Sequence, residues 1–172
     1  MAKIIKIINS LFGIGYLPGG GTCATIATFI LYQIFLLQHK RYLNLLLIIL
    51  ATIFIFLNTK IDKMKDPSYV VTDEFIGTLF GLNILSVLNG PFKLSFIFNF
   101  VSVLIFLILF RFFDIKKPFG IKKIEKLPGA FGIILDDIVA ALYALISSYF
   151  LTIIFYIIYV HIFYIYFCYI NH

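Results

Sequence analysis

The stretch IVAALYALISSYFLTIIFYIIYVHIFYIYFCYI, residues 138–170, runs for 33 residues without Asp, Glu, Lys, Arg, Gly or Pro. As an α-helix it would be about 50 Å long, which exceeds the roughly 30 Å hydrocarbon layer of a bilayer. Because nothing in it breaks a helix, we expect one membrane crossing from about Asp137 to about Ile158. The Tyr-rich tail, residues 159–172, is expected to bend along the far interface or to extend past it.

Four shorter apolar stretches precede this one, and each can form a membrane helix once its interfacial ends are included. They cover residues 22–37, 43–57, 70–88 and 94–110, and three of them are expected to extend to Tyr16, Tyr42 and Phe113. The sequence therefore predicts an all-α fold, a polytopic membrane helical bundle with about 4–5 transmembrane helices. We expect a single domain over residues 1–172, with a core over about 13–158.

The composition excludes several other classes of protein. Of the 172 residues, 62% are hydrophobic and 13% are charged, and the mean hydropathy is +1.07. These values are too apolar for a soluble or disordered chain of this length. Two cysteines are too few for a disulfide-rich secreted module. The net charge of +6 comes from basic residues between apolar stretches, so it indicates membrane orientation and no nucleic-acid partner.

The basic residues also predict the orientation of the chain. With the N-terminus inside, 11 of the 14 Lys and Arg residues fall on the inner side and 3 on the outer side. We therefore expect the N-terminus in the cytoplasm and the C-terminus outside. No signal-peptidase site follows Lys3 and Lys6, so the N-terminal segment is expected to be retained.

All eight acidic residues fall on or beside the predicted inner side, and five of them lie within a turn or two of an apolar stretch. These five are Asp73, Glu74, Asp114, Asp136 and Asp137, whereas Asp62 and Glu125 are expected to be solvated loop charges. A carboxylate at such a depth is costly to bury unless a partner or a metal compensates its charge. Oxygen ligands from several helices favour Mg²⁺ over Zn²⁺, which prefers His and Cys. The alternative is that the acids only pair with nearby lysines.

Basic residues accompany the acids in RFFDIKKPFGI, residues 111–121. Arg111 and Asp114 would share one face of a helix, and Lys117 can turn back towards the same place. An arginine and a lysine beside carboxylates suit a phosphate group. The alternative is a basic cluster that only marks the inner membrane face.

A glycine-rich segment, GYLPGGGT at residues 15–22, directly precedes the first apolar stretch. Gly21 and Thr22 would begin a helix whose first N–H groups can bind an anion. The alternative is a turn that only starts a membrane helix.

Four segments occur in order along the chain: GYLPGGGT (15–22), KDPSYVVTDEFIG (65–77), RFFDIKKPFGI (111–121) and GAFGIILDDIVAALYA (129–144). The set resembles the phosphatidylglycerophosphatase A family, which has KDP-x-x-hydrophobic-x-x-DE-x-x-G, FR-hydrophobic-FD-x-x-KP-x-x-I and G-x-G-I-x-x-DD-x-x-A in this order. The chain departs from the family pattern at small or loop residues, namely Gly20, Ala24, Gly120 and Ala141. No acidic residue of the motifs is lost.

The resemblance implies a multi-pass, Mg²⁺-dependent lipid phosphatase of the bacterial-type inner membrane with a cytoplasmic active site. Its substrate would be the phospholipid phosphatidylglycerophosphate, converted to phosphatidylglycerol. We assign catalytic roles to Asp73, Glu74, Asp114, Asp136 and Asp137, and metal binding to Asp73, Glu74, Asp136 and Asp137. Substrate binding is assigned to Arg111, Lys117, Gly21, Thr22 and Asp66.

Metal-assisted hydrolysis is favoured over other phosphatase chemistries. Neither Cys23 nor Cys168 has an Arg six residues further on, and the His residues lie far from the acids in the sequence. Mg²⁺ would lower the pKa of a bound water, and Glu74 or Asp114 would remove its proton. The main alternative function is a small cation transporter or channel, which predicts acids throughout the bilayer depth and not at one face.

Overall fold

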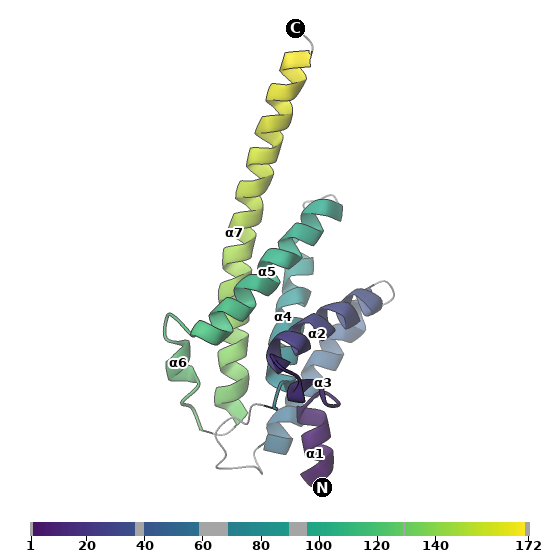
Figure 1. Cartoon of the computed structure of the whole chain (residues 1–172), viewed down its shortest axis with the longest axis vertical. Helices are drawn as coiled ribbons and strands as arrows, with labels where there is room; N and C mark the ends of the chain where they lie inside the picture. Colours follow the sequence, from purple (N-terminus) through teal and green to yellow (C-terminus); the bar gives the residue numbers. More distant parts are fainter. Residues whose placement is uncertain (1, 37–39, 59–68, 90–95, 129, 171–172) are drawn as a thin grey trace.

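A computed structural model describes residues 2–36, 40–58, 69–89, 96–128 and 130–170. Its elements are α1 (Ala2–Asn9), the 3₁₀ helix η1 (Ile14–Tyr16), α2 (Gly20–Leu36), α3 (Lys40–Asn58), α4 (Thr72–Asn89), α5 (Phe96–Lys116), α6 (Ile121–Ile124) and α7 (Ala130–Ile170). All regular structure in these ranges is helical, which confirms the predicted all-α class. The helices gather around the lower half of α7, and the C-terminal part of α7 extends beyond them (Figure 1).

The apolar stretches of the sequence each form a helix. The four shorter ones correspond to α2, α3, α4 and α5. The last one belongs to α7, which begins at Ala130 and continues as one helix to Ile170, so the chain does not bend after Ile158. Phe98–Lys116 and Phe131–Tyr164 are long and apolar enough to cross a membrane, and only 28% and 33% of their 18-residue apolar segments are buried. The exposed apolar surface of these two helices is unfavourable in water.

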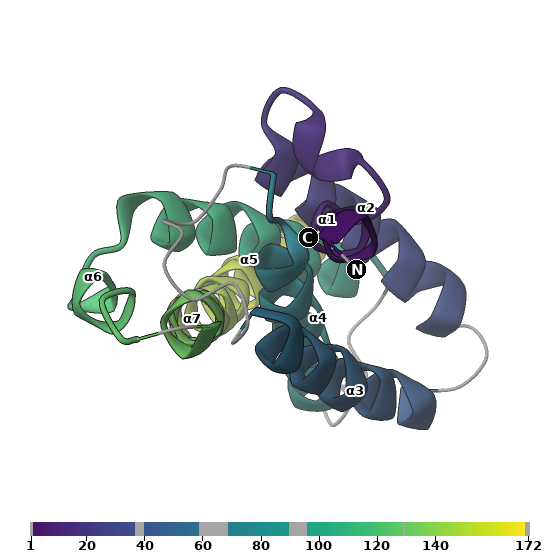
Figure 2. The same ribbon diagram turned by 90° about the horizontal axis from the view of Figure 1, so that it is seen from below.

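Helix α4 is the central helix of the bundle. It packs against α2, α3, α5 and α7, and the view along the molecule from below shows these helices around it (Figure 2). Twelve of its 18 residues are buried. A helix that is buried on all sides needs neighbours on all sides. The first turn of α4 carries Asp73, which is buried, and Glu74, whose side chain is 15% exposed.

Hydrogen bonds tie the start of α4 to the N-terminal segment. The Val71 N–H donates to the carbonyl of Asn9 at 2.9 Å, and the Thr72 hydroxyl donates to the carbonyls of Ile8 and Asn9 at 3.2 and 3.1 Å. These carbonyls lie at the C-terminal end of α1, where the helix has no further N–H groups in its own ladder to pair with them; the Ile8 carbonyl also accepts the N–H of Leu11 at 2.9 Å. The same bonds fix the backbone that leads directly into Asp73.

Candidate active site

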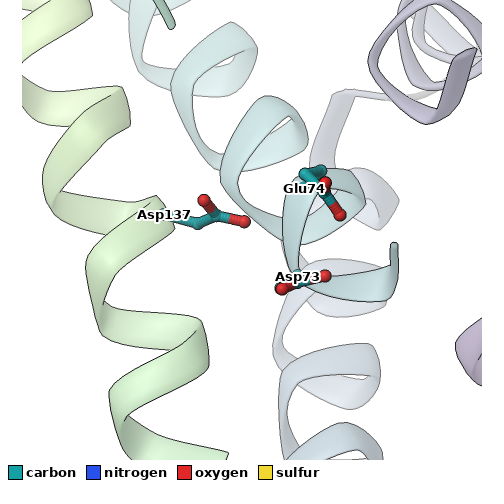
Figure 3. A group of neighbouring side chains, drawn as sticks. All are labelled: Asp73, Glu74 and Asp137. Carbon is teal, nitrogen blue, oxygen red and sulfur yellow. The ribbon is translucent and has the colours of Figure 1, made fainter. Parts of the chain in front are cut away.

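Three carboxylates from two helices meet inside the bundle. Asp73 and Glu74 lie in the first turn of α4, and Asp137 lies about two turns from the start of α7. One oxygen of each lies within 4.8 Å of the others. The Asp137 side chain points from α7 towards the first turn of α4 (Figure 3). Separate helices thus bring acidic residues together, as the sequence predicts.

The chemistry of this group suits a metal ion. Asp73 and Asp137 are buried, and Glu74 is mostly buried. The buried oxygens Glu74 Oε2 and Asp137 Oδ2 have no hydrogen-bond partner among the described residues. Carboxylates this close together repel one another unless a cation or a proton compensates their charge. Because carboxylate oxygens are the ligands that hard divalent cations prefer, the group can hold a metal ion.

Arg111, on α5, lies beside the same group. Its Nη1 donates to Asp114 Oδ2 at 2.5 Å and lies 3.6 Å from Glu74 Oε1. The pairing of Arg111 with Asp114 across one helical turn confirms the shared face expected from the sequence. The Nε of Arg111 is buried and has no hydrogen-bond partner in the part of the chain that the structure describes. Carboxylates thus hold the guanidinium in place, and its Nε–H can still donate a hydrogen bond to a phosphate oxygen.

Lys117 turns back towards the bundle from the end of α5, as its place before Pro118 predicts. Its φ of 46° is the left-handed conformation that often ends a helix. Its Nζ donates to Asp136 Oδ2 at 2.5 Å and lies 3.2 Å from Glu125 Oε1. Burial lowers the pKa of Lys117, but the hydrogen bond and charge of Asp136, together with Glu125, outweigh burial and raise that pKa above its ordinary value. Lys117 therefore carries a positive charge at neutral pH.

Asp136 lies in a different environment from the next residue along α7. One of its oxygens pairs with Lys117, and the other accepts the backbone N–H of Asp137 at 3.0 Å. It does not belong to the group of three carboxylates that can share a metal. Metal binding by Asp136 stays a prediction. Its contact with Lys117 agrees with the alternative interpretation of the sequence, in which the acidic residues pair with nearby lysines.

The glycine-rich segment reaches the site through Gly21. This residue lies in the first turn of α2, and a Cβ at this position would collide with Glu74 Oε1 and lie 2.8 Å from Arg111 Nη2. Thr22 is exposed, and its role in substrate binding stays a prediction. Asp66, the remaining predicted substrate-binding residue, lies outside the described residues.

Glu125 makes a contact that the sequence did not predict. Its side chain is 47% exposed, which agrees with a solvated loop charge, yet it also pairs with Lys117. The short helix α6 packs against α7 and brings the loop back to the site. Gly120, with a φ of 92°, lies in the turn before α6, and a glycine there indicates a turn in the sequence. Such a turn signal does not show that Glu125, further along, pairs with Lys117.

The fold and the site define a class of protein: an all-helical chain with long apolar helices, in which a buried carboxylate group and neighbouring basic residues can bind a metal and a phosphate. The chain belongs to the phosphatidylglycerophosphatase A family, because the family model, described as Phosphatidylglycerophosphatase A, matches residues 7–152. This match confirms the resemblance that the four sequence segments carry.

Two relatives cover most of the chain. A phosphatidylglycerophosphatase A from Haemophilus influenzae is 34% identical over 160 residues, which cover 84% of this chain and 90% of the relative. A protein from Bacteroides thetaiotaomicron, provisionally named as a phosphatidylinositol-3-phosphatase, is 30% identical over 148 residues, which cover 81% of this chain and 88% of the relative. No solved structure matches the chain.

Proposed function

We propose that this protein is a membrane-embedded phosphatase that hydrolyses the terminal phosphomonoester of phosphatidylglycerophosphate to phosphatidylglycerol and phosphate. The observation that carries the proposal is the group of Asp73, Glu74 and Asp137 beside Arg111, in a chain of the phosphatidylglycerophosphatase A family. Acidic metal ligands and a neighbouring guanidinium are suited to a phosphomonoester and its metal. Cation transport, the alternative from the sequence, is not favoured because of the family membership.

Asp73, Glu74 and Asp137 are the proposed ligands of Mg²⁺. Each offers an oxygen to a common centre, and Mg²⁺ favours one or a few carboxylates together with water and substrate oxygens. When bound, Mg²⁺ would polarise the phosphoryl group and lower the pKa of a bound water. Asp136, which the sequence also predicts as a ligand, is proposed to act chiefly by holding Lys117 beside the site.

Arg111 is the proposed phosphate-binding residue. Its guanidinium can donate two parallel hydrogen bonds to a phosphate group. Asp114 accepts a hydrogen bond from one edge of this group and so orients it. The Arg111 Nε lacks a hydrogen-bond partner among the described residues, so it can bind a substrate oxygen without first breaking a bond within the protein. Lys117 adds a positive charge next to Asp136.

A carboxylate near the metal group must take the proton of the attacking water. The sequence offers Glu74 and Asp114 for this role. Glu74 belongs to the proposed ligand group, whereas Asp114 lies outside it and still interacts electrostatically with Asp137. We therefore favour Asp114 as the general base. Its contact with Arg111 would link proton transfer to phosphate binding.

The chain is proposed to be a multi-pass protein of a bacterial-type inner membrane, with about 4–5 crossings and the site at the cytoplasmic face. Two helices have the length and hydropathy that a crossing requires. On α2, exposed isoleucines recur at one-turn spacing, at Ile26, Ile30 and Ile34. The exposed lysines Lys122 and Lys123 of α6 fit the inner side. A lipid phosphate would reach the site from the inner leaflet while its acyl chains stay in the bilayer.

The test is phosphate release by the detergent-purified protein, with Mg²⁺ or with EDTA. The substrates are phosphatidylglycerophosphate, phosphatidylinositol 3-phosphate and the water-soluble glycerol 3-phosphate. We expect Mg²⁺-dependent release that is fastest with phosphatidylglycerophosphate. Faster release from phosphatidylinositol 3-phosphate would overturn the substrate assignment in favour of the activity for which the Bacteroides relative is named. No release from either lipid would overturn the proposed function.

A further inference from the structure

Gly77 lies one helical turn after Asp73 on α4 and is buried against α7. A Cβ at this position would lie 3.1 Å from Asp137 Cβ, 3.2 Å from the Asp137 carbonyl oxygen and 3.1 Å from Phe110 Cζ. Real Cβ contacts are rarely this short, so any side chain here would move a neighbour by a few tenths of an ångström. The backbone of Asp137 therefore approaches α4 at a position that has no side chain.

This close approach coincides with the carboxylate group. Residues four apart lie on the same face of a helix, so Gly77 and Asp73 face the same side of α4. Small residues let two helices come closer than larger ones allow. Asp137 extends only one methylene from its backbone, so the separation of α4 and α7 at Gly77 decides how near its oxygens come to those of Asp73 and Glu74.

We propose that Gly77 is a positioning residue for the metal centre: by lacking a side chain, it sets the distance of Asp137 from Asp73 and Glu74. The inference rests on the proposed metal site and adds a residue that binds neither metal nor substrate. Metal sites tolerate only small errors in ligand distance, so a shift of a few tenths of an ångström weakens binding.

Gly81, one turn further along α4, is a matched control. A Cβ there would collide with the ring of Phe106 on α5, a more severe contact than any at Gly77. Helix α5 carries none of the three proposed ligands. The same substitution on the same helix therefore disturbs packing at Gly81 and disturbs ligand placement at Gly77.

Phe110 offers a second control, because a Cβ at position 77 would also lie 3.1 Å from its ring. If Gly77 only makes room for this ring, a smaller residue at position 110 should relieve the effect of Gly77→Ala. If Gly77 sets the approach of Asp137, the contact with the Asp137 backbone remains and the effect should persist. The double variant Gly77→Ala with Phe110→Leu separates the two roles.

The experiment measures Mn²⁺ binding by electron paramagnetic resonance, without substrate, to the full-length protein in detergent, alongside thermal unfolding. For Gly77→Ala we expect the Mn²⁺ Kd to rise about tenfold, the effect of disturbing a ligand's support. For Gly81→Ala we expect a lower Tm than for Gly77→Ala, with the Kd within about twofold of wild type, because distant changes rarely couple. The double variant should bind as weakly as Gly77→Ala.

Three results would overturn the inference. A wild-type Kd in Gly77→Ala would show that its side chain does not position the ligands. Recovery of binding in the double variant would assign Gly77 to ring packing, and equal losses at Gly77 and Gly81 would assign both to general stability. Absence of Mn²⁺ binding in the wild type is a separate outcome, which would overturn the proposed metal centre and this inference with it.

Discussion

Asp136 and Asp137 are neighbours on α7 and are both buried, yet their surroundings differ. Asp136 pairs with Lys117 from the loop after α5. Asp137 faces Asp73 and Glu74 of α4, and its Oδ2 has no hydrogen-bond partner among the described residues. Successive residues of a helix point about 100° apart, so two adjacent acids face two different helices.

The difference teaches how one acidic pair can serve two purposes. Burial costs each carboxylate the loss of water, and the protein compensates this loss differently at the two positions. At Asp136 a lysine of the chain supplies the positive charge. At Asp137 the nearby groups are acidic, so the compensating charge has to come from a bound cation or a proton. Under the proposed function, Asp136 holds Lys117 beside the site, whereas Asp137 is free to bind the metal ion.

The largest effect is expected for Asp137→Asn. Losing a proposed metal ligand should lower Mg²⁺-dependent phosphate release by at least about 100-fold, since even residues that only support ligands cost 10- to 100-fold. In EDTA, the Tm should stay equal to or rise above that of the wild type, because the substitution removes a charge that acidic neighbours repel. Phosphate release and thermal unfolding with EDTA check the two parts. A variant that keeps its activity, or that unfolds much more easily without metal, would contradict the proposed role.

Asp136→Asn sharpens the comparison. It should destabilise the protein by about 2 kcal/mol, because Lys117 loses a charged hydrogen-bond partner. The rate should fall, but the Mg²⁺ concentration for half-maximal rate should stay within about threefold of the wild-type value, since the lost group is not a member of the three-carboxylate site. Denaturant unfolding and a Mg²⁺ titration check this. A large rise in the required Mg²⁺ would support the sequence prediction that Asp136 is itself a ligand.

Lys117→Met tests the pairing of Lys117 with Asp136 through the pH dependence of stability. The variant should be less stable than the wild type by about 1–2 kcal/mol, because Asp136 loses its charged partner. The folded protein raises the pKa of Lys117 above its ordinary value of 10.5, so the stabilisation is fully present below that pH and is lost as the pH rises through the raised value. Unfolding followed from pH 7 to 11 should show a constant difference that shrinks only above about pH 10.5. A difference that disappears near neutral pH would contradict the assigned pairing.

The smallest effect is expected when the chain ends after Ile158. The family match ends at residue 152, and the described side chains of α7 beyond it are exposed. Truncation removes the contact of Tyr159 with Phe98, whose rings are 5.2 Å apart, but keeps those of Phe155 and Tyr156. Phosphate release should stay within about twofold of wild type, because one such ring contact contributes only about 1 kcal/mol. A severe loss of activity would place the tail within the functional core.

Much of the fold could be predicted from the sequence because hydropathy is a local property. The apolar stretches at 22–37 and 94–110 fall within or beside α2 and α5. The same locality made the shared face of Arg111 and Asp114 predictable from their spacing. The start of α7 at Ala130 was less apparent, because Gly132 and the aspartates at 136 and 137 separate its first turns from the uninterrupted apolar stretch that begins at residue 138.

The different surroundings of Asp136 and Asp137 could not be predicted from the sequence. Adjacent aspartates look alike, and only the positions of α4 and the loop after α5 decide which one meets acids and which one meets Lys117. The contact of Gly77 with Asp137 is likewise a property of two packed helices. The motif DE-x-x-G, which ends at Gly77, indicates that a glycine is needed here. Its spacing does not show which neighbouring residue the glycine faces.

The most direct test of the account is the rate of phosphate release from phosphatidylglycerophosphate, measured against Mg²⁺ concentration for the wild type, Asp136→Asn and Asp137→Asn in parallel. The account predicts saturable Mg²⁺ dependence in the wild type, a lower plateau with a similar midpoint in Asp136→Asn, and no Mg²⁺-stimulated release in Asp137→Asn. Wild-type Mg²⁺ dependence in Asp137→Asn would contradict a metal centre built on Asp73, Glu74 and Asp137.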